Sequence, residues 1–187
     1  MAAADGSPLD RPTLVAGALA GAGAYATGYL VLYLAAAARL RESLAGRVLD
    51  ATGAGVWKAV GWLFYNAHFV DAVGSFSAFG VTLTNSVSLV GEVVSPLAYA
   101  LPPLLLVAAG LAAARTATLD GVGAAALAGA TVVVGYLPLA VLGAPAFGVA
   151  GDAGTAGPAL WPAVVLAGVV YPAVFGAAGG LLARGAA

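Results

Sequence analysis

The chain has no cysteine among its 187 residues and very few charged residues. The lack of cysteine excludes disulfide bonds, thiolate-bound zinc, iron–sulfur clusters and a catalytic thiol. Charged residues make up 8% of the chain, against roughly a quarter in ordinary soluble domains. Seven basic and eight acidic residues give a net charge of −1, which leaves no basic surface for nucleic acid. These shortages argue against a soluble globular domain and against a nucleic-acid-binding module.

Known catalytic motifs are also missing. The sequence has no HExxH, no GxSxG, no phosphate-binding loop and no glycine-rich dinucleotide turn. A serine nucleophile needs a base within reach, and His68 is the single histidine. A retinal-type pigment needs a lysine deep in a late helix, whereas the single lysine, Lys58, lies near the end of an apolar segment. We therefore expect no enzymatic activity, no cofactor, no metal site and no nucleic-acid partner.

Hydrophobic residues, in contrast, make up 62% of the chain, and the mean hydropathy is +1.01. A helix needs roughly 20 mostly apolar residues to cross a bilayer core about 30 Å thick. The sequence therefore predicts an all-α polytopic transmembrane bundle that forms a single integral membrane domain over residues 1–187. Its five spans are expected at about residues 14–38, 55–73, 97–114, 122–142 and 159–183.

The second of these segments is more polar than the others. It contains Lys58, Asn66, His68 and Asp71, so it could cross the bilayer or lie along its surface. A surface helix needs a broad cationic face, and this segment has one lysine. Its middle, residues 59–65, is apolar apart from one tyrosine hydroxyl, which favours a span.

The basic residues predict an orientation in the cytoplasmic membrane, because lysine and arginine in short loops favour the cytoplasmic side. Five spans with the N-terminus outside and the C-terminus inside place six of the seven basic residues inside. A four-span chain, in which 55–73 does not cross, gives four against three. The six residues are Arg39, Arg41, Arg47, Lys58, Arg115 and Arg184.

Small residues recur at four-residue spacing in the predicted spans, and such spacing lets helix backbones approach closely. The favoured interpretation is packing within the chain. The alternative is an interface with a second copy or with other membrane subunits. The glycines concerned are Gly17, Gly21, Gly121, Gly129, Gly176 and Gly180.

Three tyrosines and several prolines also lie within the spans. Tyr25, Tyr29 and Tyr33 form an i, i+4, i+8 series that could line a polar path, although such hydroxyls more often bond to a neighbouring helix. Pro138 and Pro172 interrupt the last two spans. Transporters use broken helices to line binding sites, but ordinary membrane helices also tolerate proline.

The polar residues that remain concentrate between residues 65 and 92. Segment 74–95 alternates apolar and hydroxyl residues in part, which predicts a hairpin or a re-entrant segment. One hypothesis is an outward-facing site that binds a cation or passes a proton. The favoured alternative is structural, with helix capping, contact with water and bonds to the backbone. The candidate residues are Tyr65, Asn66, His68, Asp71 and Glu92.

Residues 57–70 read WKAVGWLFYNAHFV, in a chain rich in alanine, glycine and valine. This run resembles an uncharacterised family of small haloarchaeal multi-pass membrane proteins of unknown function. The resemblance implies a location in the cytoplasmic membrane of a salt-loving archaeon. It carries over no catalytic residues, but it draws attention to Asn66 and His68.

Two functions are consistent with these observations. The first is a non-enzymatic structural or accessory membrane subunit, with the lipid bilayer as its main partner. The second is a small transporter or channel that uses the polar cluster. Convergence of Tyr65, His68, Asp71 and Glu92 on a solvent-accessible cavity would favour transport.

Overall fold

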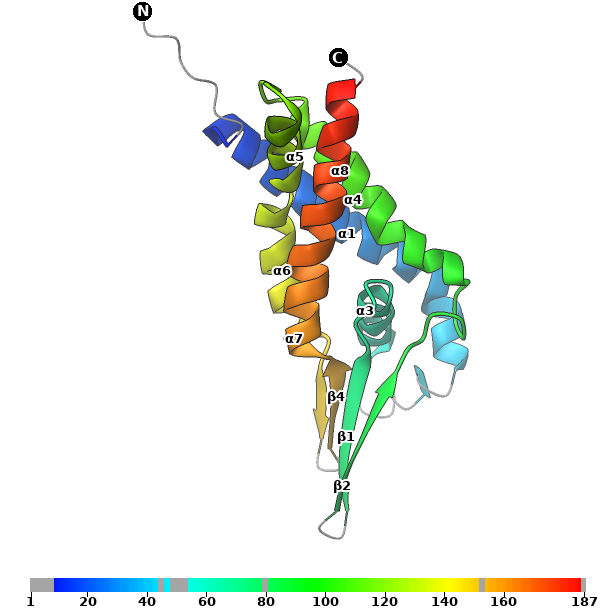
Figure 1. The fold of residues 1–187 in the computed structure, drawn as a ribbon. Coiled ribbons are helices and arrows are strands. Elements are labelled where there is room, and N and C mark those ends of the chain that lie inside the picture. The colour runs from blue at the N-terminus through cyan, green and yellow to red at the C-terminus, as the bar shows by residue number, and fades with distance from the viewer. Residues whose placement is uncertain (1–8, 44–45, 48–53, 79–80, 152–153, 186–187) are drawn as a thin grey trace, which may run out of the picture. The chain divides into compact units, whose positions relative to one another are not determined.

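The computed structural model describes residues 9–43, 46–47, 54–78, 81–151 and 154–185. These residues are mostly helical and include one four-stranded antiparallel sheet (Figure 1). The chain forms two compact units, each built from segments that are separated in sequence. The first unit uses residues up to 26, residues 102–139 and residues from 168 onward; the second uses residues 27–101 and 140–167.

Most of the helical residues belong to four long helical segments. Helix α1 begins where the Asp10 carboxylate accepts a hydrogen bond from the Thr13 N–H at 2.9 Å, a typical N-cap. In the last segment, a π-helical stretch ends at Val170, two residues before Pro172, whose ring lacks the N–H that an α-helix requires. The segments are α1 (Arg11–Glu42), η1 (Pro96–Ala100) with α4 (Leu101–Ala114), α5 (Val122–Ala130) with α6 (Val133–Ala146), and α7 (Leu160–Pro162) with η2 (Ala163–Val170) and α8 (Tyr171–Gly185).

Within the described residues, these four segments are long and apolar enough to cross a membrane. They correspond to four of the five predicted spans, with ends that agree to within a few residues. Their lengths follow from long, mainly apolar runs, because residues 14–38, 97–114, 122–142 and 159–183 contain no charged side chain that would have to reach water.

The predicted span at 55–73 has a different structure, so the five-span count is not confirmed. Helix α3 (Val56–Asn66) has 11 residues, which is about 16 Å at 1.5 Å per residue. The Phe69 N–H then bonds to the Asn66 carbonyl, and the Val70 N–H bonds to the Tyr65 carbonyl. This pattern is a Schellman motif, and Phe69 takes its left-handed position with φ 58°. The chain leaves the motif as a strand.

The all-α prediction omitted a sheet with the strand order β2-β1-β4-β3. Strands β1 (Ala72–Ala78) and β2 (Val81–Val87) form an antiparallel hairpin, which is one of the two structures expected for segment 74–95. Strands β3 (Val149–Gly151) and β4 (Gly154–Pro158) form a second hairpin, and β4 pairs antiparallel with β1. The sheet therefore joins two segments about 80 residues apart.

Aromatic rings fill the core of the second unit around Phe147. Its ring stacks on Tyr29 with centroids 5.4 Å apart, and its carbonyl accepts a hydrogen bond from the Trp62 indole N–H at 2.9 Å. The Tyr29 hydroxyl donates to the Trp57 carbonyl at 3.0 Å. Gly61 gives the Phe147 ring room, because a Cβ there would overlap the ring.

Glycines bring the helix backbones of the first unit into direct contact. A Cβ at Gly17 or Gly21 would overlap Thr131 or Val132 at the junction of α5 and α6, and Cβ atoms at Gly129, Gly176 and Gly180 would overlap backbone across the contact between α5 and α8. Gly121 does not take part in these contacts: it is the N-cap of α5 with φ 103°, and nothing lies within 4 Å of a Cβ added there. Helices in lipid pack closely at such small residues.

These contacts also give the relative directions of the helices in the first unit. Along α1, Gly17 meets Thr131, whereas Gly21, four residues later, meets Val132 and Tyr136. Helix α1 therefore runs in the same sense as α5 and α6. Along α8, Gly176 meets Gly129, whereas Gly180 meets Ala125. Helix α8 therefore runs opposite to α5 and, in this unit, opposite to α1 (Figure 1).

A matched pair of substitutions on α5 tests the glycine contact with α8. Gly129→Ala should lower the free energy of unfolding by about 2 kcal/mol, because the methyl group forces the two backbones apart. Gly123→Ala should leave it unchanged or raise it by up to about 1 kcal/mol, since nothing lies within 4 Å of a Cβ there. Unfolding in mixed micelles, followed by circular dichroism, measures both. Equal effects at the two positions would contradict the packing described.

Candidate functional site

The five predicted polar residues all lie in the second unit, but they do not share one environment. Tyr65, Asn66 and His68 are buried with 0–1% of their surface exposed. Asp71 and Glu92 are exposed. The structure thus separates three buried groups at the end of α3 from two carboxylates in contact with solvent.

Asn66 connects three segments of backbone. Its side-chain N–H group donates to the Val70 carbonyl at 2.9 Å and to the Val87 carbonyl at 3.4 Å. Its side-chain oxygen accepts from the Leu89 N–H at 2.8 Å. Because Val70 precedes β1 and Val87 ends β2, the amide joins the end of α3 to both ends of the hairpin.

Tyr65 and His68 also bond to the backbone. The Tyr65 hydroxyl donates to the Ala140 carbonyl. The His68 Nδ1 lies 2.8 Å from the Phe64 carbonyl, so Nδ1 carries the proton that it donates. Burial lowers the pKa of His68 to about 4, against a smaller raising effect of this backbone bond. The imidazole is therefore neutral near pH 7.

The carboxylates of Asp71 and Glu92 do not join these groups into a metal site. Among the described residues, no group of three or more His, Cys, Asp or Glu side chains is placed to hold a metal ion. The backbone carbonyl of Asp71 accepts the Ala159 N–H at 3.0 Å, which fixes the start of β1 beside the residue that precedes α7. Glu92 lies in the turn between β2 and η1.

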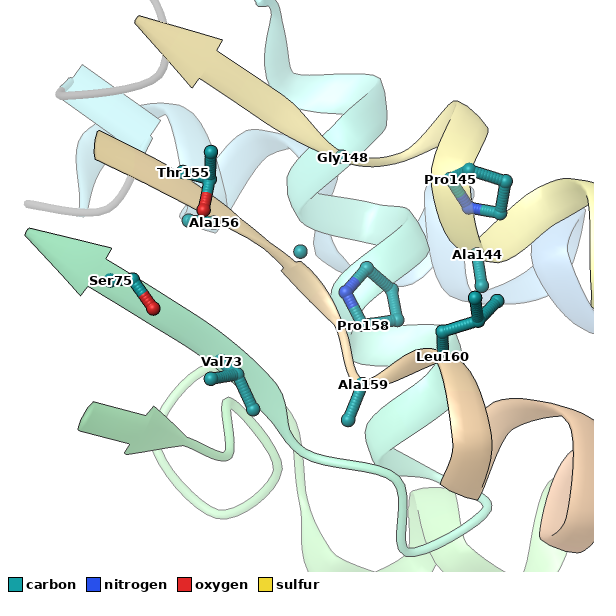
Figure 2. Close-up of a pocket in the computed structure, with 11 residues that line it drawn as sticks. Val73, Ser75, Ala144, Pro145, Gly148, Thr155, Ala156, Pro158, Ala159 and Leu160 are labelled. Atoms are coloured by element: carbon teal, nitrogen blue, oxygen red, sulfur yellow. The ribbon is translucent and has the colours of Figure 1, made fainter. Parts of the chain in front are cut away.

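A shallow pocket of about 260 Å³ lies elsewhere in the second unit (Figure 2). Strands β1 and β4 and the adjoining ends of α6 and α7 line it, and none of the lining residues that the structure describes is charged. Its polar side chains are Ser75 and Thr155, while Val73, Pro145 and Leu160 are among the apolar ones. None of the five predicted site residues lines this pocket.

The sequence carried no direct signal for this pocket. Ser75 and Thr155 are 80 positions apart and become neighbours because β1 and β4 pair in register. The short strands β3 and β4 consist largely of glycine and alanine, residues with weak strand preference. The partial alternation at 81–88 was the one usable indication, and it located the first hairpin.

Asn66→Ala tests the role of the buried amide. The substitution should lower the free energy of unfolding by about 3 kcal/mol, because the Val70 carbonyl and the Leu89 N–H lose their buried partner. Asn85→Ala, on the exposed strand β2, is the matched control and should change it by less than about 0.5 kcal/mol. Unfolding in mixed micelles compares them. A small loss of unfolding free energy in Asn66→Ala would show that the amide does not hold the end of α3 to the β1–β2 hairpin.

Comparison with known proteins identifies the family of the chain. It belongs to the family of unknown function DUF7978, which it matches over residues 1–186. This agrees with the expected resemblance to an uncharacterised family. No curated protein and no solved structure matches the chain.

Proposed function

We propose that this DUF7978 protein is a non-enzymatic integral protein of the cytoplasmic membrane, where it serves as a structural or accessory membrane subunit. The observation that carries the proposal is the distribution of apolar side chains. Large apolar side chains are exposed on all four long helical segments. The resemblance of residues 57–70 to haloarchaeal membrane proteins supports the same location.

The exposed apolar side chains are too many and too large for a surface in water. Leu19, Leu34, Leu104 and Leu142 each expose between 66% and 76% of their surface. Soluble monomers rarely expose continuous apolar patches above a few hundred Å². A bilayer around these helices gives such residues an apolar environment.

The polar cluster supports a structural role over transport. A cation or proton path through this cluster needs its ionisable groups to face a cavity. In the second unit, Tyr65, Asn66 and His68 are buried and bonded to backbone, and the pocket is lined by other residues. The carboxylates of Asp71 and Glu92 are exposed instead.

Helix directions favour four spans in place of five. In the first unit, α8 runs opposite to α1, as the glycine contacts require. A first and a last span of opposite direction imply an even number of crossings, so both termini would lie on one side. Helix α3, about 16 Å long, would not cross. Both hairpins would then lie on the side opposite the termini.

Because the chain has no cysteine, single cysteines can report this topology. Leu9→Cys, Asp120→Cys and Gly185→Cys should react with a membrane-impermeant maleimide from one side of the membrane, and Thr82→Cys from the other. Mass spectrometry compares the labelling of each cysteine in intact cells and in permeabilised cells, which shows the side of the membrane on which it lies. The five-span arrangement gives a different result, in which position 9 labels together with position 82 and opposite position 185.

Purification from native membranes in a mild detergent tests the subunit role. We expect the protein to elute with a stoichiometric membrane partner or as a defined oligomer. Purified protein in vesicles should show no proton or cation flux, with Asp120→Asn as a control for Asp71→Asn and Glu92→Gln. A flux that falls only in the latter two variants would instead establish transport.

A further inference from the structure

One face of the sheet is rich in hydroxyl groups. Side chains two apart on a strand point to the same face, and the register places Ser75 opposite both Thr84 on β2 and Thr155 on β4. The Ser77 and Thr82 hydroxyls lie 2.9 Å apart on the same face, and those of Ser75 and Thr84 lie 3.5 Å apart. The row Thr84–Ser75–Thr155 thus crosses three strands and ends at the pocket.

Beside the Ser75 and Thr155 hydroxyls of this row, the rest of the pocket lining is apolar. Val73, Ala144, Pro145 and Leu160 line it beside Ser75 and Thr155 (Figure 2). No charged residue is among the described lining residues, so an ionic ligand would have no counter-charge there. The chemistry favours a ligand that has uncharged hydroxyl or ether oxygens at one end and carbon chain at the other.

The pocket opens beside a surface that the proposed function places in lipid. Leu160 lines the pocket and exposes 51% of its surface, and its neighbour Trp161 exposes 78%. Both stand at the start of the last membrane-length helix. Exposed tryptophan is typical of the membrane–water interface. The exposed apolar surface at the start of this helix therefore includes Leu160, one of the residues that line the pocket.

The volume indicates which part of a lipid would fit. About 260 Å³ is below the range of roughly 300–1,000 Å³ for pockets that enclose a drug-sized molecule. That space suits the junction between a headgroup and its chains better than a whole lipid.

We propose that this pocket and the hydroxyl row bind a membrane lipid with an uncharged polyhydroxyl headgroup. The glycerol junction occupies the pocket against Val73 and Pro145, and the Thr155 hydroxyl donates a hydrogen bond to an oxygen of the lipid. The headgroup lies along Ser75 and Thr84, whose hydroxyls both donate and accept. The inference rests on the proposed membrane location.

Photolabelling of the full-length protein tests the site. The probe is a monoglucosyl diacylglycerol with a photoreactive diazirine near its glycerol, in phosphatidylcholine vesicles. We expect saturable labelling that maps to residues 144–160 and to β1, and competition by unlabelled monoglucosyl diacylglycerol. Labelling spread over the outer faces of the helices would overturn the proposal. So would equal competition by phosphatidylglycerol or by free glucose, since each points to a different ligand.

Variants sharpen this test. Thr155→Val keeps the shape but removes a hydroxyl that contacts the ligand, and should weaken saturable labelling about fivefold, the value of roughly 1 kcal/mol for one hydrogen bond. Ser75→Ala should act in the same direction. Thr118→Val, at an exposed threonine outside the sheet, should have no effect. Unchanged labelling in both sheet variants would overturn the proposal, while the cysteine-labelling result would still report the membrane topology separately.

Discussion

The hydrogen bonds of the Asn66 side chain hold together the corner between α3 and the β1–β2 hairpin, and the rest of the second unit depends on this corner. A continuous helix through residues 55–73 would match the hydropathy of that segment. Instead, the Asn66 amide binds the backbone of Val70, Val87 and Leu89, and the Schellman motif turns the chain at Phe69. Strand β1 begins three residues after this turn, and the hairpin, the β1–β4 pairing and the pocket all follow from it.

This corner explains why the polar residues of an apolar chain need not form a reactive site. In surroundings that hold little water, each buried donor and acceptor must find a partner within the protein. Asn66, Tyr65 and His68 provide such partners for carbonyls and N–H groups at an irregular helix end. The hydroxyl groups of Ser75 and Thr155 line the pocket instead, where a ligand can reach them.

Glycine has a corresponding role in the first unit. Apolar side chains gain little by leaving lipid for one another, so helix association depends on close packing. Gly129 and Gly176 allow the backbones of α5 and α8 to touch, and Gly17 and Gly21 do the same for α1. The spacing of these glycines was visible in the sequence. Their partners were not, because small residues are so common in this chain that many pairings are possible.

The sequence by itself determined the four long helices, since an uninterrupted apolar run of about 20 residues satisfies its own backbone only as a helix. It also located the polar region at 65–92 and indicated a hairpin within it. The early end of α3 needed tertiary information, because Phe69 occupies a position where glycine is the usual signal. The sheet and the pocket needed it as well. They arise from pairing between residues about 80 positions apart, and strand pairing depends on partners that no local sequence pattern specifies.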